Sequence, residues 1–185
     1  MKHPIAKMYT DKGVITIELY PECAPNTVNS FIWAAGEKMY KDRLIKRVVP
    51  GFVIQPSYCF FDDKRCDYHI EGEFAANGVE NPMKMEKWTV AMAGDGEKEA
   101  HGCEFFIILS DETGEKLQGR FAAFGKVIEG FEEVTRLENV KTVSVHPEGV
   151  SAIINQPVED QYMKDVEVET FGEEYPQPVI KYWCE

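Results

Sequence analysis

The sequence has no long hydrophobic run. No strictly apolar stretch is longer than five residues, the length of 105–109, whereas a helix that spans a bilayer needs about 20 apolar residues. It also lacks internal repeats, low-complexity tracts and linkers rich in serine or glycine. With 185 residues, of which 44% are hydrophobic and 12% aromatic, the chain can bury a core without metals or disulfides. These features predict one globular domain that does not cross a membrane.

Basic residues are scarce relative to acidic ones. The chain carries 20 lysines and arginines against 32 aspartates and glutamates, which gives a formal net charge of −12. A surface this acidic repels the phosphates of nucleic acids and the anionic headgroups of lipids. We therefore expect neither nucleic acid nor membrane surfaces as partners.

Paired cysteines and metal-binding motifs are also missing. The five cysteines are odd in number and show no Cys-x-x-Cys spacing, which indicates reduced thiols in the cytoplasm. The N-terminus lacks the apolar core of a signal peptide, in line with that location. The side chains that could form a metal cluster are Cys59, Cys66, His69, His101 and Cys103. Because their spacing matches no tight zinc pattern, we expect no metal and no cofactor.

Hydrophobic patterns predict short strands and two helices. Residues 6–9 and 14–20 flank a turn and form a predicted hairpin. A proline at position 25 and apolar residues at helical spacing up to position 35 predict one helix, and residues 131–137 predict a second. Further strands are expected at 43–49, 52–56, 88–93, 103–109, 121–128 and 166–168. Long loops are expected at 57–87 and 141–163.

The order of these elements predicts a mainly β fold. The strands do not alternate with helices, which argues against a parallel sheet built from strand-helix-strand units. The pattern favours a closed antiparallel β-barrel of about eight strands, capped by two α-helices. We expect the domain to span residues 1–172 and to be a monomer, with residues 173–185 as a C-terminal tail. The aromatic pair Tyr182 and Trp183 predicts that this tail docks on the domain.

Three segments concentrate side chains that can carry out chemistry. Segment 47–55 has an arginine and a glutamine on either side of a Pro-Gly turn, so Arg47 and Gln55 project close together if strands flank that turn. In segment 102–107, Glu104 and Phe106 share one face of a strand. Segment 119–127 adds further aromatic residues. From spacing alone, a structural interpretation with an exposed arginine and packed aromatic rings is favoured over a functional site.

Several segments of the chain share their order and spacing with one protein family. They are 13–20, 24–31, 47–55, 72–78, 105–107 and 124–127. Together they resemble the cyclophilins in their bacterial form, a family of barrel-shaped peptidyl-prolyl cis-trans isomerases. The resemblance covers roughly residues 6–140 and, more weakly, a final strand near 164–171. It implies that the protein accelerates rotation about Xaa-Pro bonds in polypeptides, assists folding and needs no cofactor.

The resemblance also implies roles for individual residues. Arg47 corresponds to the catalytic cation that acts on the amide being rotated. Gln55 corresponds to a second catalytic residue, the amide that holds the substrate backbone. The remaining residues that the resemblance places in the substrate-binding groove are Phe52, Val53, Ala93, Glu104, Phe106, Leu117 and Phe121.

Several groove positions depart from the family pattern. Val53 stands where the family has methionine, Glu104 replaces a glutamine, Lys116 a tryptophan and Phe121 a histidine. These changes leave an alternative to the isomerase open. The alternative is a weakly catalytic or non-catalytic module that binds Pro-containing segments of a partner protein.

The carboxylate of Glu104 has two possible partners in this scheme. It either draws the guanidinium of Arg47 toward itself or points along the groove and pairs with a cation elsewhere, such as Arg120. The first arrangement predicts a modest loss of rate, because partly exposed ion pairs are worth only about 0.2–1 kcal/mol.

Overall fold

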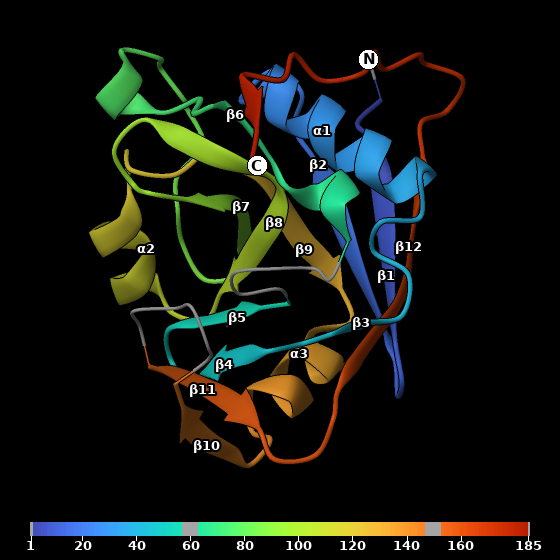
Figure 1. The fold of residues 1–185 in the computed structure, drawn as a ribbon, viewed down its shortest axis with the longest axis vertical. Helices are drawn as coiled ribbons and strands as arrows, with labels where there is room; N and C mark the ends of the chain where they lie inside the picture. The colour runs from blue at the N-terminus through green and yellow to red at the C-terminus, as the bar shows by residue number, and fades with distance from the viewer. Residues whose placement is uncertain (1, 57–62, 147–152, 185) are drawn as a thin grey trace.

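Strands make up most of the regular structure of the chain (Figure 1). The computed structural model describes residues 2–56, 63–146 and 153–184. Within these ranges the chain forms strands, three α-helices and two short 3-10 helices. The mainly β fold predicted from the sequence is confirmed.

The main sheet is antiparallel at each of its strand pairs. Its strands are β1 (Ile5–Thr10), β2 (Val14–Leu19), β3 (Arg43–Leu44), β4 (Arg47–Val49), β5 (Val53–Gln55), β6 (Tyr68–Glu71), β7 (Thr89–Gly94), β8 (Glu99–Ile108), β9 (Ala123–Glu129), β12 (Tyr162–Glu169) and β13 (Tyr182–Trp183). Neighbours follow the order β13-β6-β8-β7-β9-β2-β1-β12-β3, and β4 and β5 attach through β8.

This sheet curls without closing. Strands β3 and β13 stand at the two ends of the order, and within the described residues no pairing joins them. Each end strand has only two residues and pairs with its inner neighbour, β3 with β12 and β13 with β6. The closed barrel of about eight strands expected from the sequence is therefore corrected to an open, curled sheet.

Two helices lie at opposite ends of the curled sheet (Figure 1). Helix α1 (Pro25–Gly36) begins at the proline that predicted it and buries Val28 and Phe31. The carboxylate of Glu73 accepts hydrogen bonds from the backbone N–H groups of its first turn, including one of 2.7 Å from Thr27. Helix α3 (Phe131–Glu138) corresponds to the second predicted helix.

A third helix, α2 (Asp111–Leu117), corrects the prediction of two. Its seven residues carry no apolar periodicity, so the hydrophobic pattern does not reveal it. The hydroxyl of Ser110 accepts a 3.2 Å hydrogen bond from the backbone N–H of Thr113 and thereby caps the first turn. Two acidic residues in that turn favour the positive end of the helix.

The core divides into two clusters because successive residues of β8 point to opposite faces. Phe105 packs edge-to-face against Phe31 and Tyr40 in the main core between α1 and the sheet. The adjacent Phe106 belongs to a smaller cluster with Val53 and residues of β7 and β9 on the other face. This smaller cluster forms the wall of the site described below.

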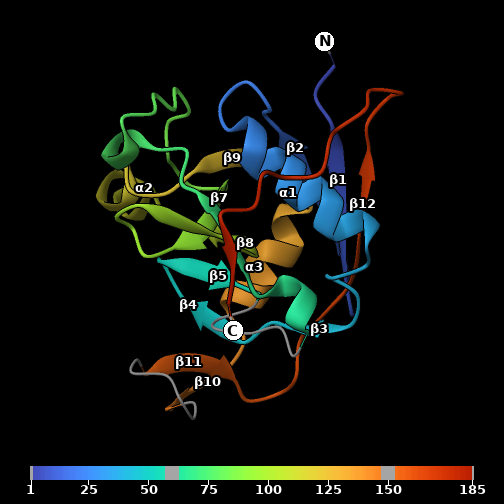
Figure 2. The same cartoon turned by 45° about the horizontal axis from the view of Figure 1, so that its top comes forward.

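The two segments expected to be loops contain strands. Segment 57–87 includes β6 and the short 3-10 helices Lys64–Cys66 and Ala75–Asn77. Segment 141–163 includes β10 (Thr142–Val145) and β11 (Ile154–Pro157), which form a separate two-stranded sheet below the main one (Figure 2). Both predictions are wrong. Strand β6 depends on pairing with distant residues of β8 and β13, which local patterns do not reveal. Strands β10 and β11 have only four residues each, and β11 contains the Gln-Pro pair that favours a loop in the sequence.

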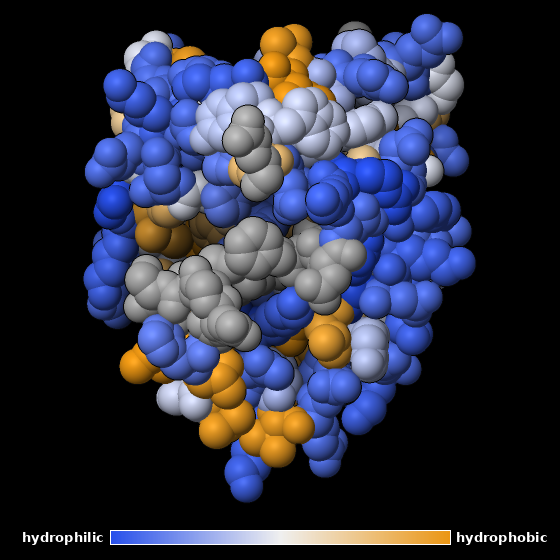
Figure 3. All heavy atoms as spheres, viewed as in Figure 1, coloured by the Kyte–Doolittle hydropathy of each residue, from blue (hydrophilic) through white to orange (hydrophobic). Residues whose placement is uncertain are grey.

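Hydrophilic side chains cover most of the face in Figure 3, as the acidic composition leads one to expect. Apolar side chains gather at the lower end, where the β10–β11 hairpin exposes Val143 and Val158 by about half and Ile153 by 70%. Of the helices in the described ranges, none has the length and apolarity needed to cross a bilayer.

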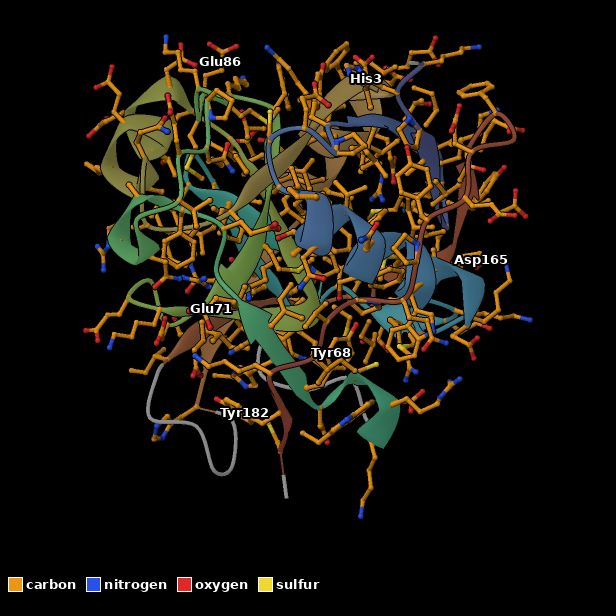
Figure 4. All side chains as sticks on the ribbon, turned by 90° about the horizontal axis from the view of Figure 1, so that it is seen from above. His3, Tyr68, Glu71, Glu86, Asp165 and Tyr182 are labelled. Carbon is orange, nitrogen blue, oxygen red and sulfur yellow. The ribbon has the colours of Figure 1, made fainter. Side chains whose placement is uncertain are left out.

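The C-terminal tail docks on the domain, as the sequence predicted. Its backbone and Asn26 of α1 exchange two hydrogen bonds at Val179, of 2.8 and 3.1 Å. Strand β13 then pairs with β6, so that Tyr182 lies opposite His69. Figure 4 shows Tyr182, Tyr68 and Glu71 in one region, where the tail reaches the sheet. The tail therefore extends the sheet by one strand.

Candidate active site

A cavity of about 280 Å³ opens beside the smaller core cluster. Its lining residues are Arg47, Phe52, Val53, Gln55, Ala93, Gly94, His101, Glu104, Phe106, Leu117 and Phe121. All nine site residues predicted from the sequence are among them. The structure adds Gly94 and His101.

Arg47 and Gln55 come together through a hairpin, as their spacing around the Pro-Gly turn predicted. Strands β4 and β5 are antiparallel, and their register places Arg47 directly opposite Gln55. The guanidinium donates a 3.0 Å hydrogen bond to the side-chain oxygen of Gln55, which is 5% exposed. A cation is thereby held at a fixed position on the cavity wall.

The rest of this wall is apolar. Val53, Ala93 and Phe106 are buried, and the rings of Phe106 and Phe121 meet edge-to-face with centroids 5.4 Å apart. The guanidinium carbon of Arg47 lies 5.6 Å from the ring centre of Phe52, within the range of a cation–π interaction. The site thus combines one cation, one amide and a compact hydrophobic surface.

A second polar pair lines the same cavity. The carboxylate of Glu104 and the Nδ1 atom of His101 are 3.1 Å apart, and the Glu104 side chain is only 10% exposed. Within the described residues, no ion pair joins Glu104 to Arg47 or to Arg120, the two cations that the sequence suggested. The partner of Glu104 is instead His101, which lies three residues earlier on the same strand.

His101 reaches the cavity because the alternation of β8 is interrupted. Ala100 and Cys103 both point into the main core, although they are three residues apart. Strict alternation would place His101 on the core face with Cys103 and Phe105, so the sequence pattern does not predict it in the cavity. The pairing of β7 with β8 shifts at Gly94, where an added Cβ would lie 2.1 Å from the carbonyl oxygen of Glu99. This irregularity is the structural feature that a sequence pattern does not contain.

The surroundings of His101 set its charge. Burial lowers the pKa of this imidazole, but the hydrogen bond and negative charge of Glu104 outweigh it, so that the pKa lies above its ordinary value. The ring of His69 meets His101 edge-to-face at 4.8 Å. Burial and the charge of His101 lower the pKa of His69. The ring of Tyr182 stacks on the ring of His69, with centroids 4.8 Å apart, so the C-terminal tail contacts the histidine that packs against His101.

Neither a metal-ligand cluster nor a reactive thiol at Cys103 is found among the residues that the structure describes. These residues include no group of three or more His, Cys, Asp or Glu side chains arranged to hold a metal ion. Cys59, one of the candidates named from the sequence, lies outside the described residues. Cys103 is fully buried, and burial raises the pKa of its thiol well above the usual range, so it is held as an unreactive thiol.

Comparison with known proteins gives consistent matches. The family model "Cyclophilin type peptidyl-prolyl cis-trans isomerase/CLD" matches residues 5–168. Peptidyl-prolyl cis-trans isomerase B of Bacillus subtilis is 34% identical over 140 residues, which cover 70% of this chain and 86% of that protein. Peptidyl-prolyl cis-trans isomerase-like 2 of Gibberella zeae is 33% identical over 141 residues, which cover 74% of this chain but only 23% of that longer protein.

A solved structure shares the fold. The crystal structure of a Cryptosporidium parvum cyclophilin type peptidyl-prolyl cis-trans isomerase, determined in the presence of the dipeptide Ala-Pro, matches with a TM-score of 0.71. The match covers 90% of this chain and 99% of that chain, at 21% sequence identity. The overall arrangement of strands and helices is therefore one that this chain shares with that protein.

Proposed function

Because the chain belongs to the cyclophilin-type peptidyl-prolyl cis-trans isomerase family, we propose that its cavity binds the proline of an Xaa-Pro segment and accelerates rotation about that bond. The family indicates the reaction, and the roles of individual residues are our proposal. The observation that carries it is the contact of 3.0 Å between Arg47 and Gln55 beside an apolar wall.

Rotation about the bond is slow because the prolyl nitrogen donates its lone pair into the carbonyl, which gives a barrier of about 18–20 kcal/mol. In the twisted state the lone pair is localised on the nitrogen. A cation that donates a hydrogen bond there stabilises the twisted state more than the planar one, which lowers the barrier. Arg47 supplies this cation, and Gln55 orients it and holds the substrate backbone.

The apolar wall suits a proline ring. A proline side chain has no polar atoms, so it gains free energy from burial against aromatic and aliphatic groups without leaving a hydrogen bond unmade. Phe52, Phe106, Leu117 and Phe121 provide such a surface around the cavity. Val53 contributes a smaller contact than the methionine usual in the family.

The substrates that we propose are Xaa-Pro segments of polypeptides, including folding chains, in which unaided isomerisation takes tens of seconds or more. We propose residues 1–172 as the catalytic domain and 173–185 as a docked tail, acting as a monomer. The net charge of −12 argues against nucleic acid and membrane surfaces as partners. The free cysteines at 23, 66, 103 and 184 support a cytoplasmic location.

The alternative is a module that binds Pro-containing segments with little or no catalysis. The carboxylate of Glu104 inside the cavity favours it, because a glutamine occupies this position in the family pattern. The two functions differ in one measurable way: only an enzyme accelerates isomerisation.

A protease-coupled isomerisation assay on Xaa-Pro tetrapeptides separates these functions. We expect the wild-type protein to raise the isomerisation rate above the uncatalysed background in proportion to its concentration. The matched control is Arg65→Ala, which removes an exposed arginine outside the cavity and should leave the rate unchanged. A wild-type rate equal to the background would leave only the binding module.

A further inference from the structure

We propose that Glu104 gives the cavity a preference for Xaa-Pro segments that carry a lysine or arginine within two residues of the proline. This inference rests on the proposed function, because it names the class of substrate that the same cavity prefers. It concerns recognition by Glu104, whereas Arg47 carries the catalytic role.

The carboxylate of Glu104 is only partly satisfied. Its Oε2 atom contacts Nδ1 of His101 at 3.1 Å, and within the described residues its Oε1 atom makes no hydrogen bond or ion pair. The side chain is 10% exposed and lines the cavity, so a ligand in the cavity can reach it. Placing a charged carboxylate in such a sheltered position costs free energy unless a cation or hydrogen-bond donors compensate it.

The two arginines that the sequence suggested as partners of Glu104 contact other groups. Arg47 donates to Gln55 and lies over the ring of Phe52, and Arg120 is directed at the carbonyl oxygen of Gly96. His101 neutralises Glu104 only when its imidazole is protonated. When His101 is neutral, the pair presents a net negative charge to the cavity.

The distance from Glu104 to Phe106 matches the spacing between residues of an extended peptide bound in the cavity. Glu104 and Phe106 share one face of β8 and are two residues apart, which corresponds to a separation of about 6.5 Å along a strand. An extended peptide advances by a similar distance in two residues. When its proline packs against Phe106, the side chain of a residue one or two positions away can therefore approach Glu104.

His101 acts as a positioning residue for this carboxylate. Its ring is held on one side by Glu104 and on the other by His69, which is stacked under Tyr182 of the tail. These contacts restrict the rotation of both members of the pair. The carboxylate is thereby fixed before a substrate arrives, which reduces the entropy lost on binding.

The test compares peptides that differ only in charge. In an alanine background around one proline, lysine, glutamine or glutamate is placed at each of the two positions before and after it. Exchange spectroscopy by NMR gives kcat/KM for each peptide without a coupling protease. For at least one position we expect wild-type protein to favour lysine over glutamine by about three- to fivefold, the scale of a partly exposed ion pair.

Two variants assign this preference to Glu104. Glu104→Gln should bring the lysine-to-glutamine ratio close to one. The matched control Glu174→Gln removes the same charge from an exposed position of the tail and should keep the wild-type ratio. Raising the ionic strength from about 10 mM to 0.5 M should shrink the wild-type ratio, because salt screens the pair.

The inference is overturned if lysine is not favoured at any position, or if Glu104→Gln retains the full preference. Its failure is distinguishable from failure of the proposed function, which would appear as no acceleration of any peptide by wild-type protein. In that case dissociation constants of the same peptides, measured by NMR titration, test the recognition alone. Tighter binding of the lysine peptide that Glu104→Gln abolishes supports the inference even without catalysis.

Discussion

Two polar pairs line the same cavity, and they differ in charge and in how the fold assembles them. Arg47 and Gln55 face each other across two strands, with side-chain atoms 3.0 Å apart, and carry a positive charge. His101 and Glu104 come from one irregular strand, 3.1 Å apart, and carry a negative charge when the imidazole is neutral. In our proposal, catalysis and substrate preference therefore belong to separate side chains of one small site.

The largest loss of activity is expected at Arg47, the cation of the first pair. If this pair supplies the catalytic cation, Arg47→Ala should lower kcat/KM on a neutral Xaa-Pro peptide by at least about 10²-fold, the scale of losing one preorganised donor. The protease-coupled assay measures this, with Arg65→Ala as the arginine control. A variant with undiminished activity would remove Arg47 from the mechanism.

A smaller loss is expected at its partner. Gln55→Ala removes the oxygen that accepts the 3.0 Å hydrogen bond from Arg47, and hydrogen bonds to charged groups are worth about 1.5–3 kcal/mol. We expect kcat/KM to fall by about tenfold, less than for Arg47→Ala because the cation remains. Thermal unfolding should be followed in parallel, since Gln55 is buried. A loss as large as that of Arg47→Ala would indicate that Gln55 itself acts on the reacting bond.

The pair of His101 and Glu104 predicts that the substrate preference depends on pH. The rate on neutral peptides should not show this dependence. The groups that face His101 are His69 from β6, Asp95 before β8, and Glu99 and Glu104 on β8 itself. Their net effect raises the pKa of His101 above its ordinary value of about 6.5. As the pH rises through that pKa, the imidazole loses its charge and the carboxylate is no longer neutralised.

The preference for lysine over glutamine peptides should therefore grow by about two- to threefold with pH, in a step above pH 6.5. The substrate lysine keeps its charge throughout this range. His101→Gln should abolish the step. His69→Gln should retain it, because the pKa of His69 is lowered and its own titration falls below that range. A step that persists in His101→Gln would contradict this assignment.

Local patterns predicted the elements whose signals are contained in neighbouring residues. Helix α1 followed from a proline at its first position and apolar residues at helical spacing, and the β4–β5 hairpin followed from its Pro-Gly turn. Strands β6 and β13 were missed because their partners lie far away in the sequence. Strands β10 and β11 pair with each other, but they have only four residues each and adjoin or contain prolines that favour a loop. Helix α2 was missed because its evidence is a polar cap at Ser110 and not an apolar stripe.

The residues of the cavity likewise divide into those that the sequence predicted and one that it did not. Its nine predicted lining residues came from a resemblance that fixes residue types at matching positions, and the structure gathers all of them around one space. The partner of Glu104 could not be predicted, because it depends on an interruption of β8 between Ala100 and Cys103. A sequence pattern assumes regular alternation, and here the irregular position carries the histidine.

The most direct test of the central claim separates binding from rotation. NMR titration gives the dissociation constant of an Ala-Pro-containing peptide, and exchange spectroscopy at saturation gives the rate of cis-trans interconversion of the bound peptide. For Arg47→Ala, we predict that this bound-state rate falls by at least about 10²-fold, whereas the dissociation constant changes by only a few fold. An unchanged bound-state rate, with the whole loss of activity in the dissociation constant, would contradict it.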